Sequence, residues 1–373
     1  MKLRYKIGGT IVVLLVLALS SLALVLSHNK ACPTAPELAA GSNTMKAIVY
    51  RCYGPPEVLQ LEDREMPTVA DNEVLVKIEA ASVNPLDWHY MRGAPYVMRL
   101  MGAGLGAPAD TSMGVDFAGT IEAVGSDVTR FQPGDEVFGG RGGAFGEYLS
   151  MPEDRAISLK PDNVSFEQAA AVPIAAVSAL QALRDKGQLQ AGQKVLINGA
   201  SGGVGTYAVQ IAKAMGAEVT GVCSTRNLDM VRSIGADHVI DYKKDNFTER
   251  EERYDLVIDN VGNHSFLAYR NVLKPGGMLV IVGGSSGNWI GPFTNPLKAV
   301  VGSPFVDYDF AMLMAVMNQD DLAFLAELMA SGEMSSVIDR RYPLSEVAEA
   351  VAYSESGRAR GKIIVNVVAN TTE

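Results

Sequence analysis

The sequence contains few of the side chains that bind metals or form disulfide frameworks. Its 373 residues include only three cysteines and four histidines. Cys32, Cys52 and Cys223 lie far apart and fit neither a disulfide framework nor a zinc knuckle. The histidines, at positions 28, 89, 238 and 264, show no metal-ligand spacing such as His-x-x-x-His. We therefore expect no metal site.

Basic residues are also outnumbered. Lysine and arginine total 32 against 42 aspartate and glutamate residues, which gives a net charge of −10. A nucleic-acid-binding surface needs a basic stripe that displaces counterions, so the composition argues against a nucleic-acid partner. The length is sufficient for two domains, each with its own core.

Charge is missing from one long stretch near the N-terminus. Lys2, Arg4 and Lys6 precede residues 8–26, which carry no charged side chain. These 19 residues, at about 1.5 Å of helical rise each, span roughly 28 Å, enough for the hydrocarbon core of a bilayer. We expect a single hydrophobic helix within residues 1–30 that anchors the protein to a membrane. A cleaved signal segment is the alternative, and it is disfavoured because no good cleavage site follows the apolar run.

The rest of the chain divides by its pattern of strands and helices. Residues 31–44 have the small, proline-containing composition of a linker. Residues 45–165 read as a β-rich domain whose short strands are separated by glycine and proline turns. Residues 166–305 alternate helices at 166–185 and 204–216 with strands at 194–198, 218–223, 237–241, 255–259 and 277–282, which predicts a doubly wound parallel sheet. Residues 306–369 contain helices near 308–331 and 344–356 and two more strands, and we expect them to return to the first domain.

A glycine-rich turn follows the first strand of the expected parallel sheet. Val195–Asn198 is apolar until its last residue, Gly199–Gly205 contains four glycines, and a helix pattern starts at Val204. Glycines let the backbone approach a pyrophosphate, and the N–H groups of a helix N-terminus face its negative charge. Tight turns also require glycine for conformational reasons alone, so the turn by itself is weak evidence.

An ordered series of short motifs resembles the medium-chain dehydrogenase/reductase superfamily, in its zinc-independent quinone oxidoreductase branch. The motifs extend over nearly all of residues 45–368, and the first 44 residues lie outside the resemblance. It implies a GroES-like β-rich catalytic domain followed by a Rossmann domain. The matching stretches are Met45–Val49, Ser82–Asp87, Gly114–Gly119, Pro133–Val137, Gly199–Gly205, Gly235–Asp237, Asp259–Gly262 and Gly361-Lys362.

The departures from the zinc-dependent relatives are equally informative. Those enzymes have a zinc-binding cysteine near the position of Asn84 and a Gly-His-Glu stretch where this chain has Gly114-Val115-Asp116. Asparagine is a poor zinc ligand and valine is none, so we expect a metal-free catalytic site. For Asp116 we favour a role in bracing the backbone.

The cofactor is expected to be NADPH. In a dinucleotide-binding fold, an acid after the second strand binds a ribose 2′-OH, whereas cationic or hydroxyl groups accommodate a 2′-phosphate. Here Ser224, Thr225 and Arg226 occupy that corner. The alternative is that the two hydroxyls only cap the next helix. The expected cofactor-binding residues are Ser201, Gly202, Gly203, Val204, Gly205, Ser224, Thr225 and Arg226, with Tyr242, Val261 and Lys362 added by the resemblance.

The resemblance, together with the chemistry of hydride transfer, implies three side chains as candidates for the catalytic site. Hydride delivery to a quinone or enone leaves negative charge on an oxygen, which hydrogen-bond donors must stabilise. Asn84, Tyr96 and Ser178 offer an amide, a phenol and a hydroxyl. Each has an alternative: Asn84 could bond its own loop, Tyr90 competes with Tyr96, and Ser178 could bond its own helical turn.

The leading hypothesis is an NADPH-dependent oxidoreductase that reduces quinones or α,β-unsaturated carbonyl compounds. An alcohol dehydrogenase and a membrane-associated NADPH-binding scaffold or redox sensor with little turnover are the alternatives. Three basic residues, Lys2, Arg4 and Lys6, precede the apolar run and only Lys30 follows it closely. This charge distribution predicts a catalytic domain outside the cytoplasm. NADPH is a cytosolic cofactor, so the side of the membrane that the domain faces stays open. The resemblance also implies a homodimer that extends a sheet through the strand near 277–282.

Overall fold

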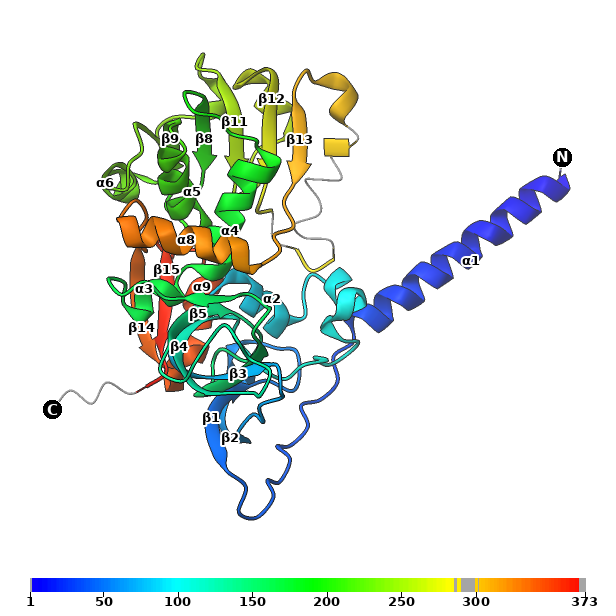
Figure 1. Cartoon of the computed structure of the whole chain (residues 1–373). Coiled ribbons are helices and arrows are strands. Elements are labelled where there is room, and N and C mark those ends of the chain that lie inside the picture. The colour runs from blue at the N-terminus through cyan, green and yellow to red at the C-terminus, as the bar shows by residue number, and fades with distance from the viewer. Residues whose placement is uncertain (1, 285–286, 290–298, 301, 369–373) are drawn as a thin grey trace.

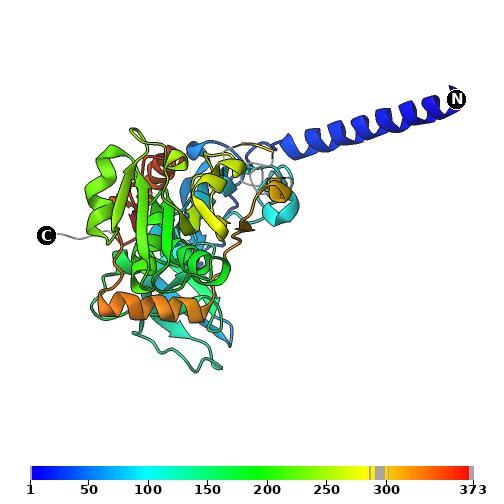
Figure 2. The same cartoon turned by 90° about the horizontal axis from the view of Figure 1, so that it is seen from above.

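The computed structural model describes residues 2–284, 287–289, 299–300 and 302–368, with side chains from residue 13 onward. It contains two lobes, each built on a β-sheet, and a long N-terminal helix that projects away from both (Figures 1 and 2). The α/β class expected from the sequence is confirmed, with a β-rich lobe and a lobe built on a parallel Rossmann sheet.

The Rossmann lobe contains six strands that pair in parallel throughout. Their order is β10-β9-β8-β11-β12-β13. The buried residues of these strands are mostly apolar because helices or loops cover both faces of a parallel sheet. They are β8 (Lys194–Asn198), β9 (Glu218–Cys223), β10 (His238–Asp241), β11 (Tyr254–Asp259), β12 (Leu273–Ile281) and β13 (Asp309–Met312).

The strand expected at a dimer edge lies inside this sheet. β12 pairs with β11 on one side and with β13 on the other. Its N–H and C=O groups are therefore already engaged in the sheet. The prediction that a homodimer extends the sheet through residues 277–282 is wrong, because the edge strand here is β13.

The region predicted as a helix over 308–331 contains a strand and a helix. β13 takes the first residues, and α8 runs over Gln319–Ser331. The helix starts there because the side chain of Asn318 accepts a hydrogen bond from the backbone N–H of Asp321, at 2.8 Å. The pattern of the apolar run before Asn318 fits a helix or a buried strand equally well. Residues 309–312 form a strand because they pair with β12.

The helix predicted over 166–185 is also divided. α3 (Phe166–Ala170) ends before Pro173, and α4 (Pro173–Gln181) begins at that proline. Proline has no N–H, and its ring clashes with the preceding turn of a continuous helix. The break leaves the N-terminus of α4 facing the catalytic lobe, where the backbone N–H of Ile174 donates to Asp116.

The catalytic lobe is formed by two separate parts of the chain. Its main sheet has the order β14-β15-β3-β4-β5-β7, and β6 also pairs with β3. β15 lies antiparallel to β3, so the C-terminal strands complete the sheet begun by the first domain. The elements are β1 (Thr44–Val49), β2 (Gln60–Glu65), β3 (Glu73–Val83), α2 (Pro85–Arg92), β4 (Asp116–Val124), β5 (Glu136–Gly140), β6 (Tyr148–Pro152), β7 (Ile157–Leu159), β14 (Ile338–Pro343), α9 (Val347–Glu355) and β15 (Lys362–Asn366).

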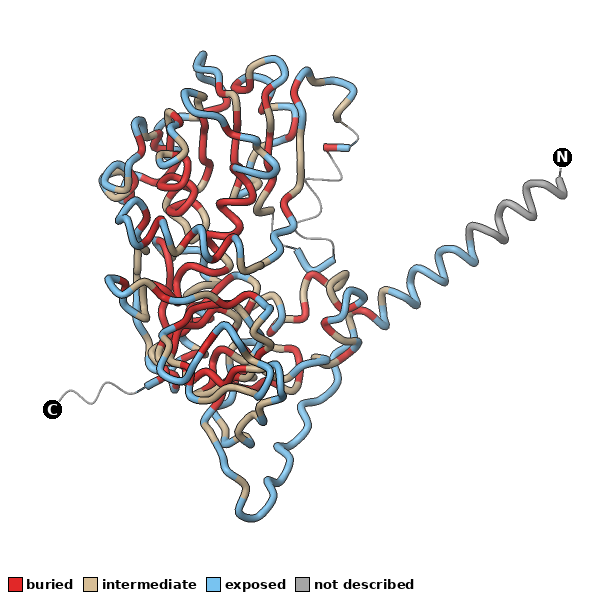
Figure 3. Tube along the Cα trace, in the orientation of Figure 1, coloured by how far each residue is buried: buried red, intermediate tan, exposed pale blue. Residues whose placement is uncertain are grey.

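One apolar core extends from the Rossmann lobe into the catalytic lobe (Figure 3). It includes Val177 and Leu180 of α4, Tyr207 of α5 (Gly203–Ala214), and Ala118 and Phe138 of the catalytic sheet. Close-packed interiors resist relative movement, so this shared core fixes how the two lobes face each other.

The N-terminal helix α1 runs over Lys2–Ser27. In the part of the chain that the structure describes, no helix is both long enough and apolar enough to cross a membrane. The membrane anchor predicted for residues 8–26 is therefore not supported.

The expectation that the cysteines form no disulfide is wrong. Cys32, in the segment predicted as a free linker, pairs with Cys52, and their Cα atoms lie 4.8 Å apart. Cys223 is buried and unpaired. A sequence separation of 20 residues gave no sign of this pair, because spacing along the chain does not record which segments the fold brings together.

Candidate active site

The glycine turn has the form of a phosphate cradle. After β8, the chain turns at Gly199, whose φ of 81° favours glycine, and α5 begins at Gly203 with Gly202 as its N-cap. A Cβ on Gly205 would lie 2.1 Å from the carbonyl oxygen of Gly199, so only glycine fits this close contact. A Cβ added at Gly202 or Gly203 would meet its nearest atom at 3.5 or 3.4 Å, which is ordinary van der Waals contact. The N–H groups in the first turn of α5 have no partner within the helix and suit a negatively charged group.

Two buried amide oxygens beside this turn have no hydrogen-bond partner. Asn227 donates from Nδ2 to Ser201 Oγ at 2.9 Å, and Asn260 donates to the carbonyl oxygen of Asn198 at 3.0 Å. The Oδ1 atom of each asparagine is left unpaired. Buried acceptors in proteins are normally satisfied, and the ribose hydroxyls of a dinucleotide are suitable donors. The residues present therefore fit a dinucleotide. Sequence reasoning missed both asparagines, although Asn227 directly follows the predicted Ser224–Arg226 corner.

The Ser224–Arg226 corner does not cap a helix. Ser224 is buried, and its side chain makes no cap hydrogen bond. The hydroxyl of Thr225 instead donates to Asp241 Oδ2 at 2.6 Å, and this bond is the main reason why the pKa of Asp241 is lowered. Arg226 is exposed and donates to the carbonyl oxygen of Arg358 at 2.7 Å. Asp241, at the end of β10, is thus an acid at this corner. The sequence did not reveal it, because the prediction considered only the residues that directly follow the second strand.

Tyr242 and Val261 lie just beyond the carboxyl ends of their strands. The backbone N–H of Tyr242 donates to the carbonyl oxygen of Cys223, and that of Val261 to Asp259 Oδ1 at 3.1 Å. Both side chains are substantially exposed. These ends of β10 and β11 are on the side of the sheet where ligands of such folds bind.

A buried polar cluster joins the cofactor turn to the catalytic lobe. Lys362 opens β15 directly after Gly361, whose N–H donates to the carbonyl oxygen of Ser201 at 2.9 Å. The ammonium group of Lys362 donates to Asn84 Oδ1 at 2.6 Å and lies 3.4 Å from Asp116 Oδ2. Asp116 also accepts from Asn84 Nδ2 at 2.9 Å, and both groups are almost fully buried.

Asp116 has the bracing role expected for it. Its Oδ1 atom accepts from the backbone N–H of Ile174 in the first turn of α4 at 3.1 Å, and Ser82 Oγ donates to its Oδ2 atom at 3.1 Å. The carboxylate therefore connects β3, β4 and α4. A negative group at a helix N-terminus is favoured by the helix dipole.

Burial controls the ionisation of this cluster. Burial raises the pKa of Asp116, whereas Lys362 and the hydrogen bonds from Asn84, Ile174 and Ser82 lower it. Burial lowers the pKa of Lys362, while Asp116 and Asp87 raise it. Burial also raises the pKa of Asp87, to about 7. Three titratable groups thus share one dry region beside the cofactor turn.

The amide of Asn84 faces inward. An ammonium group can only donate, so the atom of Asn84 that faces Lys362 must be its oxygen. Its Nδ2 atom is then used by Asp116 and, at 3.5 Å, by the carbonyl oxygen of Ser82. The expected use of Asn84 as a free amide donor does not match this geometry, in which Asn84 orients Lys362.

Tyr96 and Ser178 lie outside this hydrogen-bonded cluster. The backbone N–H of Tyr96 donates to the carbonyl oxygen of Asn288 at 2.6 Å, and its ring meets the ring of Trp289 edge-on at 5.0 Å. Tyr96 thus connects the catalytic lobe with the segment after β12. Ser178 is buried in α4. The competing Tyr90 is partly exposed on α2.

The sequence and the fold were compared with known proteins. A family described as "Zinc-binding dehydrogenase" matches residues 234–365, and "Alcohol dehydrogenase GroES-like domain" matches residues 70–162. A 2-methylene-furan-3-one reductase of Solanum lycopersicum is 33% identical over 87% of this chain and 79% of its own length. A chloroplast envelope quinone oxidoreductase homolog of Arabidopsis thaliana is 34% identical over 86% of this chain and 98% of its own. The chain belongs to the medium-chain dehydrogenase/reductase superfamily, in its quinone oxidoreductase-like branch.

Solved structures agree with this placement of the oxidoreductase. The quinone oxidoreductase from Coxiella burnetii superposes with a TM-score of 0.77 at 32% identity, over 87% of this chain and all of the other. The Escherichia coli quinone oxidoreductase complexed with NADPH gives a TM-score of 0.74 at 26% identity, over 86% of this chain and 100% of the other. The chain is therefore an NAD(P)H oxidoreductase of this family.

The donor set of this oxidoreductase does not fit the zinc named in one family description. Among the described residues, no three histidine, cysteine, aspartate or glutamate side chains form a group that could hold a metal ion. Two buried acids of the candidate site, Asp87 and Asp116, share their region with Lys362, whose positive charge opposes a second cation. No step of the reaction is therefore assigned to a metal.

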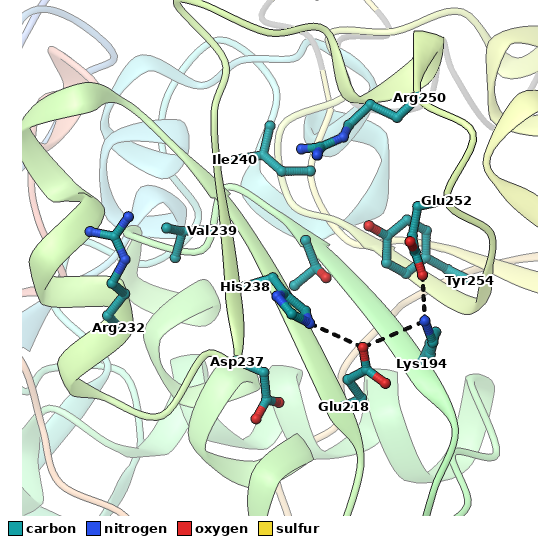
Figure 4. Close-up of a pocket in the computed structure, with 11 residues that line it drawn as sticks. Lys194, Glu218, Arg232, Asp237, His238, Val239, Ile240, Arg250, Glu252 and Tyr254 are labelled. Carbon is teal, nitrogen blue, oxygen red and sulfur yellow. Dashed lines mark hydrogen bonds and ion pairs between the residues drawn. The ribbon is translucent and has the colours of Figure 1, made fainter.

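A cavity of about 420 Å³ lies at the amino ends of the Rossmann strands, opposite the end that carries the cofactor turn (Figure 4). Lys194, Glu218, His238 and Tyr254, at the first residues of β8 to β11, are among its lining residues. Its polar side chains pair with one another: Glu218 accepts a hydrogen bond from His238 at 3.1 Å, and Lys194 forms an ion pair with Glu252. In open α/β sheets, ligands bind at the carboxyl ends of the strands, so this cavity is separate from the cofactor turn.

Proposed function

We propose that this oxidoreductase uses NADPH to reduce quinones or α,β-unsaturated carbonyl compounds by hydride transfer, without a metal. The observation that carries the proposal is the position of Lys362, whose side chain passes Gly203 of the cofactor turn and ends in the Asn84–Asp116 cluster. The names of the relatives, a furanone reductase and a quinone oxidoreductase homolog, support this substrate class.

Residues around the glycine turn would hold the cofactor. The N-terminus of α5 suits the pyrophosphate, and the unpaired Oδ1 atoms of Asn227 and Asn260 suit ribose hydroxyls. Tyr242 and Val261 flank this site at the strand ends. When bound, NADPH supplies the hydride.

Arg226 supports the choice of NADPH over NADH. Its exposed guanidinium group forms none of the ion pairs found among the described residues, so its charge is available to a 2′-phosphate. Asp241 would repel a phosphate, but Thr225 and the N–H of Lys243 donate to it, and Lys244 lies 3.9 Å away. Its negative charge is therefore partly neutralised.

Donors are needed where the substrate oxygen becomes negative. The ammonium group of Lys362 has three N–H bonds, and its hydrogen bonds with Asn84 and Asp116 account for two of them. We assign the third N–H bond of Lys362 to the substrate oxygen, and we assign to Asn84 and Asp116 the role of orienting the ammonium group. Tyr96, which reaches across to Trp289, is the proposed phenol donor, and Ser178 the proposed hydroxyl donor.

The test uses the purified full-length chain. It should oxidise NADPH in the presence of 1,4-naphthoquinone or methyl vinyl ketone, and the rate should not change after treatment with a metal chelator. It should use NADPH with a higher kcat/KM than NADH. Tight NADPH binding without turnover across a broad panel of quinones and enones would overturn the proposal, as would loss of activity on chelation that zinc restores.

A further inference from the structure

The chain after α1 is seated on the catalytic lobe. Residues 26–32, which we call the docking segment, lie against residues 93–106. We call this connection after α2 the 93–106 loop, and it includes a short helical turn at Arg99–Ala103. The backbone N–H of Lys30 donates to the carbonyl oxygen of Gly106 at 2.7 Å. A Cβ on Gly106 would lie 3.3 Å from the side chain of Lys30, so the two segments are in close contact.

Arg99 is the polar centre of this contact. Its buried guanidinium group donates to the carbonyl oxygens of Gly93 at 2.8 Å, Leu26 at 2.7 Å and His28 at 3.0 Å, and to Asn29 Oδ1 at 2.8 Å. Three of these four acceptors belong to the docking segment. None of the ion pairs among the described residues includes Arg99, so its burial depends on these neutral acceptors.

Two aromatic rings complete the surroundings of Arg99. Its guanidinium carbon lies 4.3 Å from the ring centre of Tyr53 and 4.7 Å from that of Tyr96. Cations are attracted to the faces of aromatic rings at these distances. The hydroxyl of Tyr53 donates to the carbonyl oxygens of Ala103 and Gly104, at 2.6 and 2.8 Å. The 93–106 loop is therefore held through Tyr53 as well as through Arg99.

A covalent bond closes this arrangement. Cys52 precedes Tyr53 in the chain, and its disulfide with Cys32 attaches the end of the docking segment beside the loop. Cys32 is exposed, so a soluble dithiol can reach the bond. Reduction by a dithiol such as dithiothreitol breaks the Cys32–Cys52 bond, gives two thiols on the protein and leaves the reagent as its own disulfide.

We propose that the docking segment is the outer support of the 93–106 loop and that Arg99 is a positioning residue for Tyr96. The inference rests on the proposed function, in which Tyr96 meets the substrate. The same loop contacts the Rossmann lobe through Tyr96 and Trp289, so a loop released from the docking segment would also lose its position across the substrate site. The glycine turn and the Lys362 cluster make none of these contacts.

The test compares the oxidised full-length chain, the chain treated with dithiothreitol, and the variants Cys32→Ser and Arg99→Met. Each change should raise the KM for the quinone by about tenfold, the effect of losing roughly one hydrogen bond's contribution, and leave the Kd for NADPH unchanged. Arg130→Met is the matched control, because Arg130 also stacks on an aromatic ring, Phe131, but on the turn between β4 and β5. Dithiothreitol should have no further effect on Cys32→Ser.

Hydrogen exchange separates this inference from the proposed function, because it requires no turnover. Reduction, or Cys32→Ser, should speed amide exchange in residues 93–106 and leave residues 194–205 unchanged. Unchanged exchange in the loop together with an unchanged quinone KM would overturn the inference, even if Arg99→Met failed to fold. Absence of turnover with every quinone and enone would overturn the proposed function, and the exchange rates would still decide whether the docking segment supports the loop.

Discussion

Replacing Asp87 with asparagine should remove a large pH dependence of stability. Asp87 is buried in the first turn of α2, and its Oδ2 atom accepts from the backbone N–H of Asn84 at 2.7 Å. Burial raises its pKa from 3.8 to about 7; the N–H of Asn84 and the charge of Lys362 oppose this rise, and Asp116 adds to it. Asparagine keeps an acceptor for the N–H but does not titrate.

The sign follows from which state holds the proton. Between pH 3.8 and about 7, folded Asp87 keeps a proton that the unfolded chain has released. The stability of the wild-type chain therefore falls as the pH rises through this window. A difference of about three pKa units, at 1.36 kcal/mol each, corresponds to roughly 4 kcal/mol. Asp87→Asn should be more stable than the wild type by up to about this amount at neutral pH and above.

Urea unfolding of the full-length chain across this pH range measures the effect. Subtracting the two curves removes the titrations that the two proteins share, and leaves the titration of Asp87 together with its coupling to Asp116 and Lys362. The free energy of unfolding of Asp87→Asn should rise relative to the wild type by up to about 1.4 kcal/mol per pH unit. Asp229→Asn, whose side chain is fully exposed, is the control and should follow the wild type. Parallel curves for Asp87→Asn and the wild type would refute the reasoning.

Four further substitutions test the cofactor turn, the Lys362 cluster and the Arg226 corner. Lys362→Met should lower kcat/KM for a quinone by about a hundredfold or more, the effect typical of a lost transition-state donor, and wild-type kinetics would contradict its assignment. Gly205→Ala should destabilise the fold by about 1–3 kcal/mol, because the added Cβ meets fixed backbone. Gly202→Ala should have the stability of the wild type but bind NADPH more weakly. Thermal melts measure the first effect and binding titrations the second. Arg226→Gln should raise the KM for NADPH by about tenfold and leave that for NADH unchanged, whereas equal changes for both cofactors would remove Arg226 from the 2′-phosphate site.

The sequence predicted those parts of the fold that depend on local pattern. The buried residues of β8 to β12 are mostly apolar, and parallel strands covered on both faces have this composition. The turn at Gly199–Gly205 could be recognised because its glycines are required by close backbone contacts, which a sequence records directly. The split at Pro173 was also present in the sequence, as a residue that cannot continue a helix.

Other features depend on contacts between distant residues. β13 became a strand because an edge of the Rossmann sheet was available, and its own residues fit a helix equally well. Cys32 and Cys52 meet because the docking segment is held on Arg99. Asp241 reaches Thr225 from the next strand. None of these neighbours can be inferred from spacing along the chain.

Strand register explains how the candidate site forms. Lys362 and Asn84 are separated by 278 residues, yet β15 pairs antiparallel with β3 so that Ile363 lies opposite Val83. Continuing this register by one residue sets Lys362 opposite Asn84. β3 in turn pairs with β4 so that Ser82 lies opposite Asp116, which accounts for the third member of the cluster. A slip of one residue in β15 would turn Lys362 to the other face of the sheet. The return of the C-terminal strand therefore positions Lys362, and Gly361 fixes that position against the cofactor turn through its hydrogen bond to Ser201.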